Sequence, residues 1–138
     1  MSPETLPEEV QRLLRAHVPT YEHLAVLLLL YRERGRMWSI QELGQALRIA
    51  SKLMDCALAD LIRAGLVQIA SHEPEPQYRY GAAQSVDAAV ALLAREYSDN
   101  PVGVVKFLSA GAIQRLRTSA LRAFSDAFVI TKRERDDG

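Results

Sequence analysis

Residues 39–80, SIQELGQALRIASKLMDCALADLIRAGLVQIASHEPEPQYRY, decide the fold of this 138-residue chain. Ser39 is followed three residues later by Glu42, which is the spacing of a capping box. In such a box each side chain binds a free backbone amide at the start of a helix. The sequence therefore predicts a helix over 39–47.

A second helix is predicted over 51–64, because its apolar residues recur at the i, i+3, i+4, i+7 spacing of one helical face. These residues are Met54, Ala57, Leu58 and Leu61. The opposite face carries Lys52, Asp55, Cys56, Ala59 and Arg63. Gly65 follows, at the position where helices commonly end in a left-handed residue.

A hairpin is expected to complete the stretch. Residues 66–69, Leu-Val-Gln-Ile, have the composition of a strand, and residues 77–80, Gln-Tyr-Arg-Tyr, provide the return strand. Between them, residues 71–76 contain two prolines and are typical of an irregular tip.

This order of elements resembles the winged helix-turn-helix domain of bacterial transcriptional regulators of the MarR, PadR and ArsR types. Residues 39–47 are similar to their supporting helix, and 51–64 to their recognition helix. Residues that could pack this helix pair as in those families are Leu43, Ala46, Leu47, Met54, Leu58, Leu61 and Gly65. The resemblance implies a mainly α fold with a small β-hairpin, the wing, and a second helix that most often enters the major groove of double-stranded DNA.

The winged domain is expected to extend over 20–83, preceded by an N-terminal helix within 1–19 that Pro19 interrupts. Its first helix is predicted over 20–34, mostly buried and closed by Gly35. Met37 and Trp38 are expected to anchor the chain in the core before the supporting helix begins.

Residues 84–128 are predicted to form C-terminal helices, with a break at Pro101 and a turn at 109–111, and 129–138 a charged flexible tail. Phe124 and Phe128 belong to the apolar pattern of the last of these helices. Two apolar helices added to so small a domain need a partner surface, and we expect a homodimer. The alternative is that these helices complete a monomeric core.

The residues expected to contact DNA lie on the probe helix and around it. On the helix they are Ser51, Lys52, Asp55, Cys56 and Arg63, and around it Arg36, Arg48 and Arg79. Ser51 is expected to cap the helix and touch phosphate, Lys52 to reach a guanine edge or a phosphate, and Arg63 to grip the backbone or simply to face solvent. Asp55 can accept from cytosine N4, although acidic side chains near phosphate are more often repulsive.

Charge favours a second interpretation. Within 39–80 the acidic residues Glu42, Asp55, Asp60, Glu73 and Glu75 outnumber the basic residues Arg48, Lys52, Arg63 and Arg79. Phosphate contacts supply most of the non-specific affinity for DNA, so a neutral probe binds it weakly. Other basic residues lie just before the supporting helix, at 32–36, and after Pro101. The alternative function is a winged-helix module that docks onto a protein partner.

No enzyme, metal or cofactor is expected. The histidines His17, His23 and His72 are scattered, without cysteine or carboxylate clusters at metal or triad spacing, and phosphate-loop and dinucleotide glycine patterns are missing. Even if His17 and His23 met across Pro19, such a pair is more often structural. Cys56 allows either a redox sensor or a small packing residue, and as the single cysteine it excludes an internal disulfide.

A cytoplasmic location without membrane contact is expected. The composition is 49% apolar, sufficient for one ordinary core, and the formal net charge is zero. The apolar stretch at 24–31 is far too short to span a bilayer, and the acidic amino terminus does not fit a signal peptide.

Overall fold

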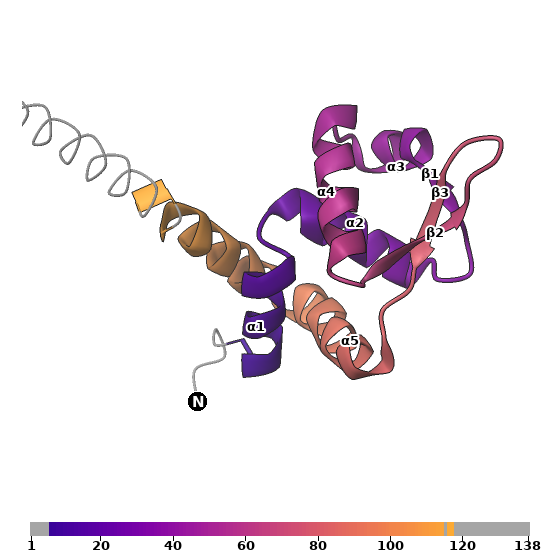
Figure 1. Ribbon diagram of the computed structural model, residues 1–138. Helices are drawn as coiled ribbons and strands as arrows, with labels where there is room; N and C mark the ends of the chain where they lie inside the picture. The colour runs from indigo at the N-terminus through magenta and orange to yellow at the C-terminus, as the bar shows by residue number, and fades with distance from the viewer. Residues whose placement is uncertain (1–5, 115, 118–138) are drawn as a thin grey trace, which may run out of the picture.

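The computed structural model describes residues 6–114 and 116–117 and is mainly helical, with a small antiparallel sheet (Figure 1). The elements in chain order are α1 (Glu8–His17), α2 (Tyr21–Arg32), β1 (Trp38–Ser39), α3 (Ile40–Leu47), α4 (Ser51–Arg63), β2 (Val67–Ser71), β3 (Gln77–Tyr80) and α5 (Gln84–Asp99). A further helix covers 101–114, and residues 116–117 are also helical. The predictions for 118–138, including Phe124, Phe128 and the tail at 129–138, lie outside the described residues.

The predicted capping box at the start of α3 is confirmed. Ser39 Oγ accepts a hydrogen bond from the Glu42 backbone amide at 3.1 Å, and Glu42 Oε1 accepts one from the Ser39 amide at 3.0 Å. The helix ends at Arg48, whose φ of 55° places it in the left-handed region. Both ends of α3 are therefore defined by local interactions of the backbone.

Strand β1 was not predicted from the sequence. Trp38 pairs with Tyr78 and Ser39 with Gln77, so the sheet has the order β1-β3-β2. Two residues are too few to show the alternating pattern of a strand, and their pairing depends on a segment almost forty residues away. Ser39 is thus both the last residue of β1 and the N-cap of α3, so the helix begins directly at the sheet.

Helix α4 packs against α2 and α3 through the predicted apolar stripe, whose members are all buried: Met54, Ala57, Leu58 and Leu61. The predicted left-handed glycine is confirmed, since Gly65 has a φ of 76°. The expectation that Ser51 caps α4 was wrong. The N-cap is Ala50, whose side chain cannot accept a hydrogen bond from the helix amides, and Ser51 is already inside the first turn.

Two details around α2 differ from the sequence prediction. The helix ends at Arg32 with Glu33 as its C-cap, so Gly35 does not close it, and Gly35 lies in the following turn without a positive φ. Trp38 is buried in the core, but Met37 remains 46% exposed. Only one of the two expected anchors therefore enters the core, because adjacent residues in an extended segment point to opposite sides.

The break at Pro101 is confirmed. Helix α5 ends at Asp99, and Asn100 caps the next helix by accepting a hydrogen bond from the Gly103 amide through its Oδ1 at 3.2 Å. The predicted turn at 109–111 was wrong, since the helix runs through these residues. A single glycine weakens a helix by only about 1 kcal/mol, which the buried neighbours Val104 and Leu108 offset.

The helices outside the central unit contribute to a single core. Helix α1 packs on α5, and Val104 and Leu108 from the last helix are buried. The guanidinium carbon of Arg15 lies 5.3 Å from the centre of the Phe107 ring. The alternative expectation, that the added helices complete the core of one chain, therefore holds for their inner faces. None of the helices in the described part of the chain has the length and apolar character needed to cross a membrane.

Candidate nucleic-acid interface

Helix α4 turns one complete face to solvent. Its buried stripe fixes the rotation of the helix, so the residues on the other side are exposed: Ser51, Lys52, Asp55, Cys56 and Arg63. The structure therefore brings together the predicted site residues of this helix on one surface. Leu53 is 51% exposed beside them and was not among the residues predicted for either face. Cys56 is exposed and is not a core packing residue.

Arg63, at the end of this face, is held by a carboxylate. Its guanidinium donates to Asp60, and Asp60 also lies 2.8 Å from Nε2 of the buried His23 on α2. The other ring nitrogen of His23 is 2.5 Å from the Thr20 hydroxyl. These hydrogen bonds connect α4 to α2, so His23 has a structural role. Among the described residues, no group of three or more side chains could hold a metal ion.

The amino end of α4 offers backbone donors. The first four amides of a helix have no acceptor within the helix, and here the N-cap Ala50 provides no side chain to satisfy them. Such amides, together with the helix dipole, favour an anion such as a phosphate. The hydroxyl of Ser51 and the ammonium of Lys52 stand in this same first turn.

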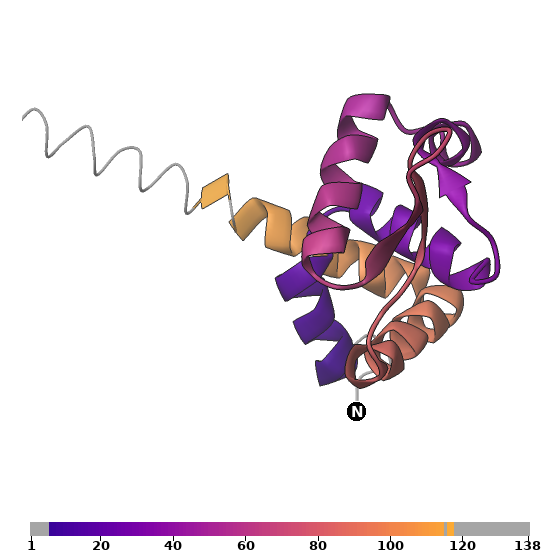
Figure 2. The ribbon, with the colours of Figure 1, turned by 45° about the vertical axis from the view of Figure 1, so that its right-hand side comes forward.

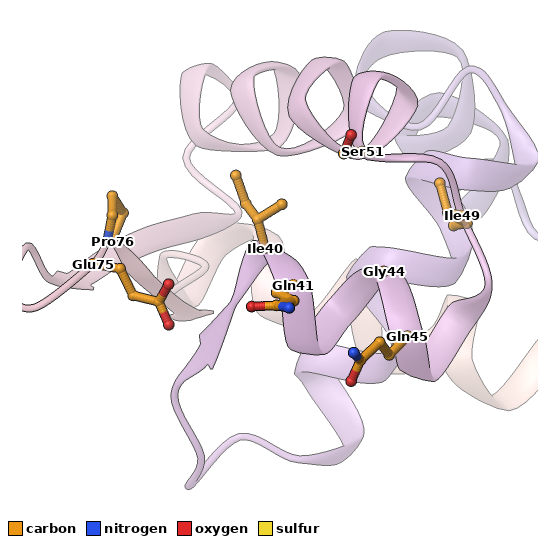
Figure 3. A pocket seen from close by; sticks show the side chains of 8 residues that line it. All are labelled: Ile40, Gln41, Gly44, Gln45, Ile49, Ser51, Glu75 and Pro76. Carbon is orange, nitrogen blue, oxygen red and sulfur yellow. The ribbon is translucent and has the colours of Figure 1, made fainter.

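A groove of about 500 Å³ lies between α3, the start of α4 and the hairpin tip (Figure 3). Its lining residues are Ile40, Gln41, Gly44, Gln45, Ile49, Ser51, Glu75 and Pro76. Figure 2 shows the hairpin tip near α3, and Glu75 and Pro76 of the tip line this side of the groove. Because the tip approaches α3 only in the folded chain, nothing in the sequence pattern indicated the groove.

Two glutamines in the groove were missed by sequence reasoning. Gln41 and Gln45 are exposed on one side of α3, four residues apart. Residues at this spacing are neighbours on a helix surface, and an amide can read adenine through paired hydrogen bonds. Two uncharged polar residues on the solvent side of α3 were the available signal. Glu75 stands across from them and gives the groove an acidic member.

The three predicted site residues outside α4 differ in their surroundings. Arg48 is exposed in the turn between α3 and α4, close in sequence to the first turn of α4. Arg79 is exposed on β3, on the face opposite the buried Tyr78. Arg36 stacks on Trp38, with its guanidinium carbon 3.7 Å from the ring centre, and binds Glu42 at 2.8 Å. Arg36 is therefore not part of the groove and its charge is matched.

Carboxylates reduce the positive charge of this surface. Burial, and next the charge of Asp55 on α4, raise the pKa of the Tyr78 phenol. The pKa of Glu42 is lowered by its hydrogen bond from the Ser39 backbone and then by Arg36. Of the two basic residues on the exposed face of α4, Arg63 binds Asp60, and Lys52 lies exposed in the first turn.

The tyrosines of β3 pack inside the protein. Tyr80 contacts Tyr31 edge to face, with ring centres 5.1 Å apart, and its hydroxyl donates to Asp87 at 2.6 Å. Tyr78 is buried between the sheet and the core. Both rings are therefore used for packing within the protein.

Comparisons with protein-family models, with curated proteins and with solved structures gave no match to this chain.

Proposed function

We propose that this chain is a transcriptional regulator that binds double-stranded DNA through a winged helix-turn-helix, formed by α3, α4 and the β2–β3 hairpin, and that it acts as a homodimer. The observation that carries the proposal is the placement of α4. One of its faces is buried, and the other is exposed from Ser51 to Arg63 beside a hairpin. The major groove of DNA is wide enough to admit a helix held in this way, with its exposed side chains toward the base edges.

The amino end of α4 is the part that best fits the nucleic acid. Free amides of its first turn and the Ser51 hydroxyl suit a phosphate, while Lys52 supplies the cation. Arg48 adds a second cation in the adjacent turn. Gln41 and Gln45 offer hydrogen bonds to base edges from the neighbouring helix.

A second function, docking onto a protein, is favoured by the charge of the same surface. Arg63 and Arg36 are paired with Asp60 and Glu42, and the hairpin tip contributes the exposed Glu73 and Glu75. The exposed Leu53 beside this face, in the first turn of α4, gives a partner an apolar contact. Under this function the face binds without phosphate contacts, so salt has little effect on affinity.

The test is a titration of the full chain against its own promoter and a random duplex at two salt concentrations. Each phosphate contact contributes about 0.9 to the slope of log affinity against log salt. We expect Lys52→Ala to weaken binding to both duplexes and to reduce this slope by about one contact. The control is Arg12→Ala, which removes an exposed cation from α1, outside both α4 and the helix over 101–114.

The two functions give different results. Lack of binding to either duplex at low salt contradicts DNA recognition and leaves the protein-docking function. Equal effects of Lys52→Ala and Arg12→Ala would show that α4 is not the contact surface even if the protein binds DNA. Loss of DNA binding by Leu53→Asp alone does not separate the two functions, because the change adds a negative charge to the face.

A further inference from the structure

The outer face of the last helix carries a line of uncovered apolar side chains. Val102 is 62% exposed, Val105 41%, Ile113 53% and Leu116 70%. On the other side of the same helix, Val104 and Leu108 are in the core. Figures 1 and 2 both show the end of this helix running away from the body of the protein, where no other described element covers it. Large side chains exposed in one line are typical of a contact surface.

The four residues are placed symmetrically about Ser109. Val105 and Ile113 lie four residues before and after it, and Val102 and Leu116 lie seven residues before and after it. Two identical helices crossing antiparallel at Ser109 therefore place Val102 opposite Leu116 and Val105 opposite Ile113. Ser109 itself is exposed and small, which allows the helix axes to approach at the centre.

We propose that a second copy of this chain covers the line of Val102, Val105, Ile113 and Leu116, and that the two helices pack antiparallel about a two-fold axis at Ser109. A two-fold contact uses the same surface on both copies, which this arrangement of residues satisfies. The inference deepens the proposed function, because it assigns the surface through which the homodimer forms.

Charge also favours a second copy in this orientation. The charged side chains described on this helix, Lys106 and Arg117, are both basic and exposed. In a parallel pair each of these residues would face the same residue of the second copy. In the antiparallel pair Lys106 lies opposite Ala112 of the second copy. Arg117 of one copy then lies opposite Pro101 of the other copy, two residues from Asp99 at the end of α5, a carboxylate that is 69% exposed. The antiparallel pair thus separates the like charges and brings each Arg117 toward the end of α5 that carries a carboxylate.

A hollow beside the line enlarges the surface available to the second copy. It measures about 170 Å³ and lies between Val105 and the start of α2 at Pro19, Thr20 and Tyr21. Tyr21 is 54% exposed there. An apolar side chain from the second copy can enter this hollow and cover the tyrosine ring.

The first measurement is the mass of the full chain in solution by analytical ultracentrifugation over a range of concentrations, without DNA. The parent protein should be a dimer. Val105→Asp and Leu116→Asp should each raise the dimer dissociation constant at least tenfold, since they place a charge in an apolar contact. Met37→Asp is the control, because Met37 is exposed to a similar degree far from this helix in the chain and should leave the dimer intact.

Cross-linking tests the orientation in a Cys56→Ser background. Ser109→Cys should form a disulfide-linked dimer under oxidation, because two copies of residue 109 meet at the axis. Val102→Cys should not, because residue 102 of one copy lies opposite Leu116 of the other. The two copies of residue 102 are then fourteen helical residues apart, about 21 Å at 1.5 Å per residue. Cross-linking of both variants would show a parallel pair and overturn the proposed orientation.

Other outcomes overturn the inference separately from the proposed function. A monomer at all concentrations refutes the contact while the DNA titration still reports on α4. A dimer whose mass is unaffected by Val105→Asp and Leu116→Asp, and which Ser109→Cys does not cross-link, uses a different surface. Retained helical circular dichroism in each variant shows that the changed mass reflects the contact and not unfolding.

Discussion

Gly65 connects the exposed helix α4 to the hairpin, and replacing it with alanine measures how much its backbone conformation matters. Its φ is 76°, and a Cβ added there would meet nothing within 4 Å. The cost therefore comes from the backbone alone. Placing a residue with a Cβ in the left-handed region costs about 1–2 kcal/mol. Alanine also lowers the entropy of the unfolded chain, which returns about 0.4–1 kcal/mol.

We expect Gly65→Ala to lower the free energy of unfolding by about 1 kcal/mol, a loss of roughly 3–5 °C in melting temperature for a chain of this size. The matched control is Gly35→Ala. An added Cβ at Gly35 also meets nothing within 4 Å, but its φ is not in the left-handed region. This variant should be as stable as the parent or more stable, because only the entropy of the unfolded chain changes.

Urea unfolding followed by circular dichroism measures both variants, with the midpoints compared at equal slope. Gly65→Asn should recover part of the loss, since asparagine tolerates the left-handed region better than alanine does. If Gly65→Ala and Gly35→Ala unfold at the same urea concentration, the left-handed turn does not limit stability and the argument fails.

Three further outcomes are expected. Arg48→Gly should raise the free energy of unfolding by up to about 1 kcal/mol in urea unfolding, because Arg48 has a φ of 55°, whereas Arg48→Ala should not. Ser39→Ala should lower it by about 1 kcal/mol through loss of the cap on α3, and an unchanged urea midpoint would contradict this role. Burial and the hydrogen bond to Asp87 raise the pKa of Tyr80 above its ordinary value of 10. As the pH rises, the unfolded chain therefore loses this proton before the folded chain does. The free energy of unfolding should fall between about pH 9 and about pH 11, and it should fall more in the parent than in Tyr80→Phe. Equal losses of stability in thermal melts of the two proteins over this pH range would refute this.

Much of the fold follows from local signals. The capping box predicts the start of α3, the apolar stripe predicts which side of α4 is buried, and Gly65 predicts where that helix ends. Each depends on residues within one or two helical turns, so the sequence pattern reports it directly. Residues 77–80 were likewise predicted as a strand with the bounds that the structure has.

The errors occurred where local signals were weak or competed. Ser51 suits an N-cap by residue type, but the chain enters α4 one residue earlier, at Ala50. Residues 109–111 have the composition of a turn, yet burial of Leu108 on the body of the protein keeps the helix continuous. In both places packing outweighed the preference of the individual residues.

The candidate surface was predicted in part. The sequence by itself determined which side chains share the exposed face of α4, because a periodic apolar stripe leaves the opposite face for solvent. Only the tertiary structure decided that Asp60 meets His23, that the hairpin tip lines a groove with Gln41 and Gln45, and that β1 joins β3. Contacts between residues far apart in the chain exist only after the helices have packed, so the one-dimensional pattern of residue types does not specify them.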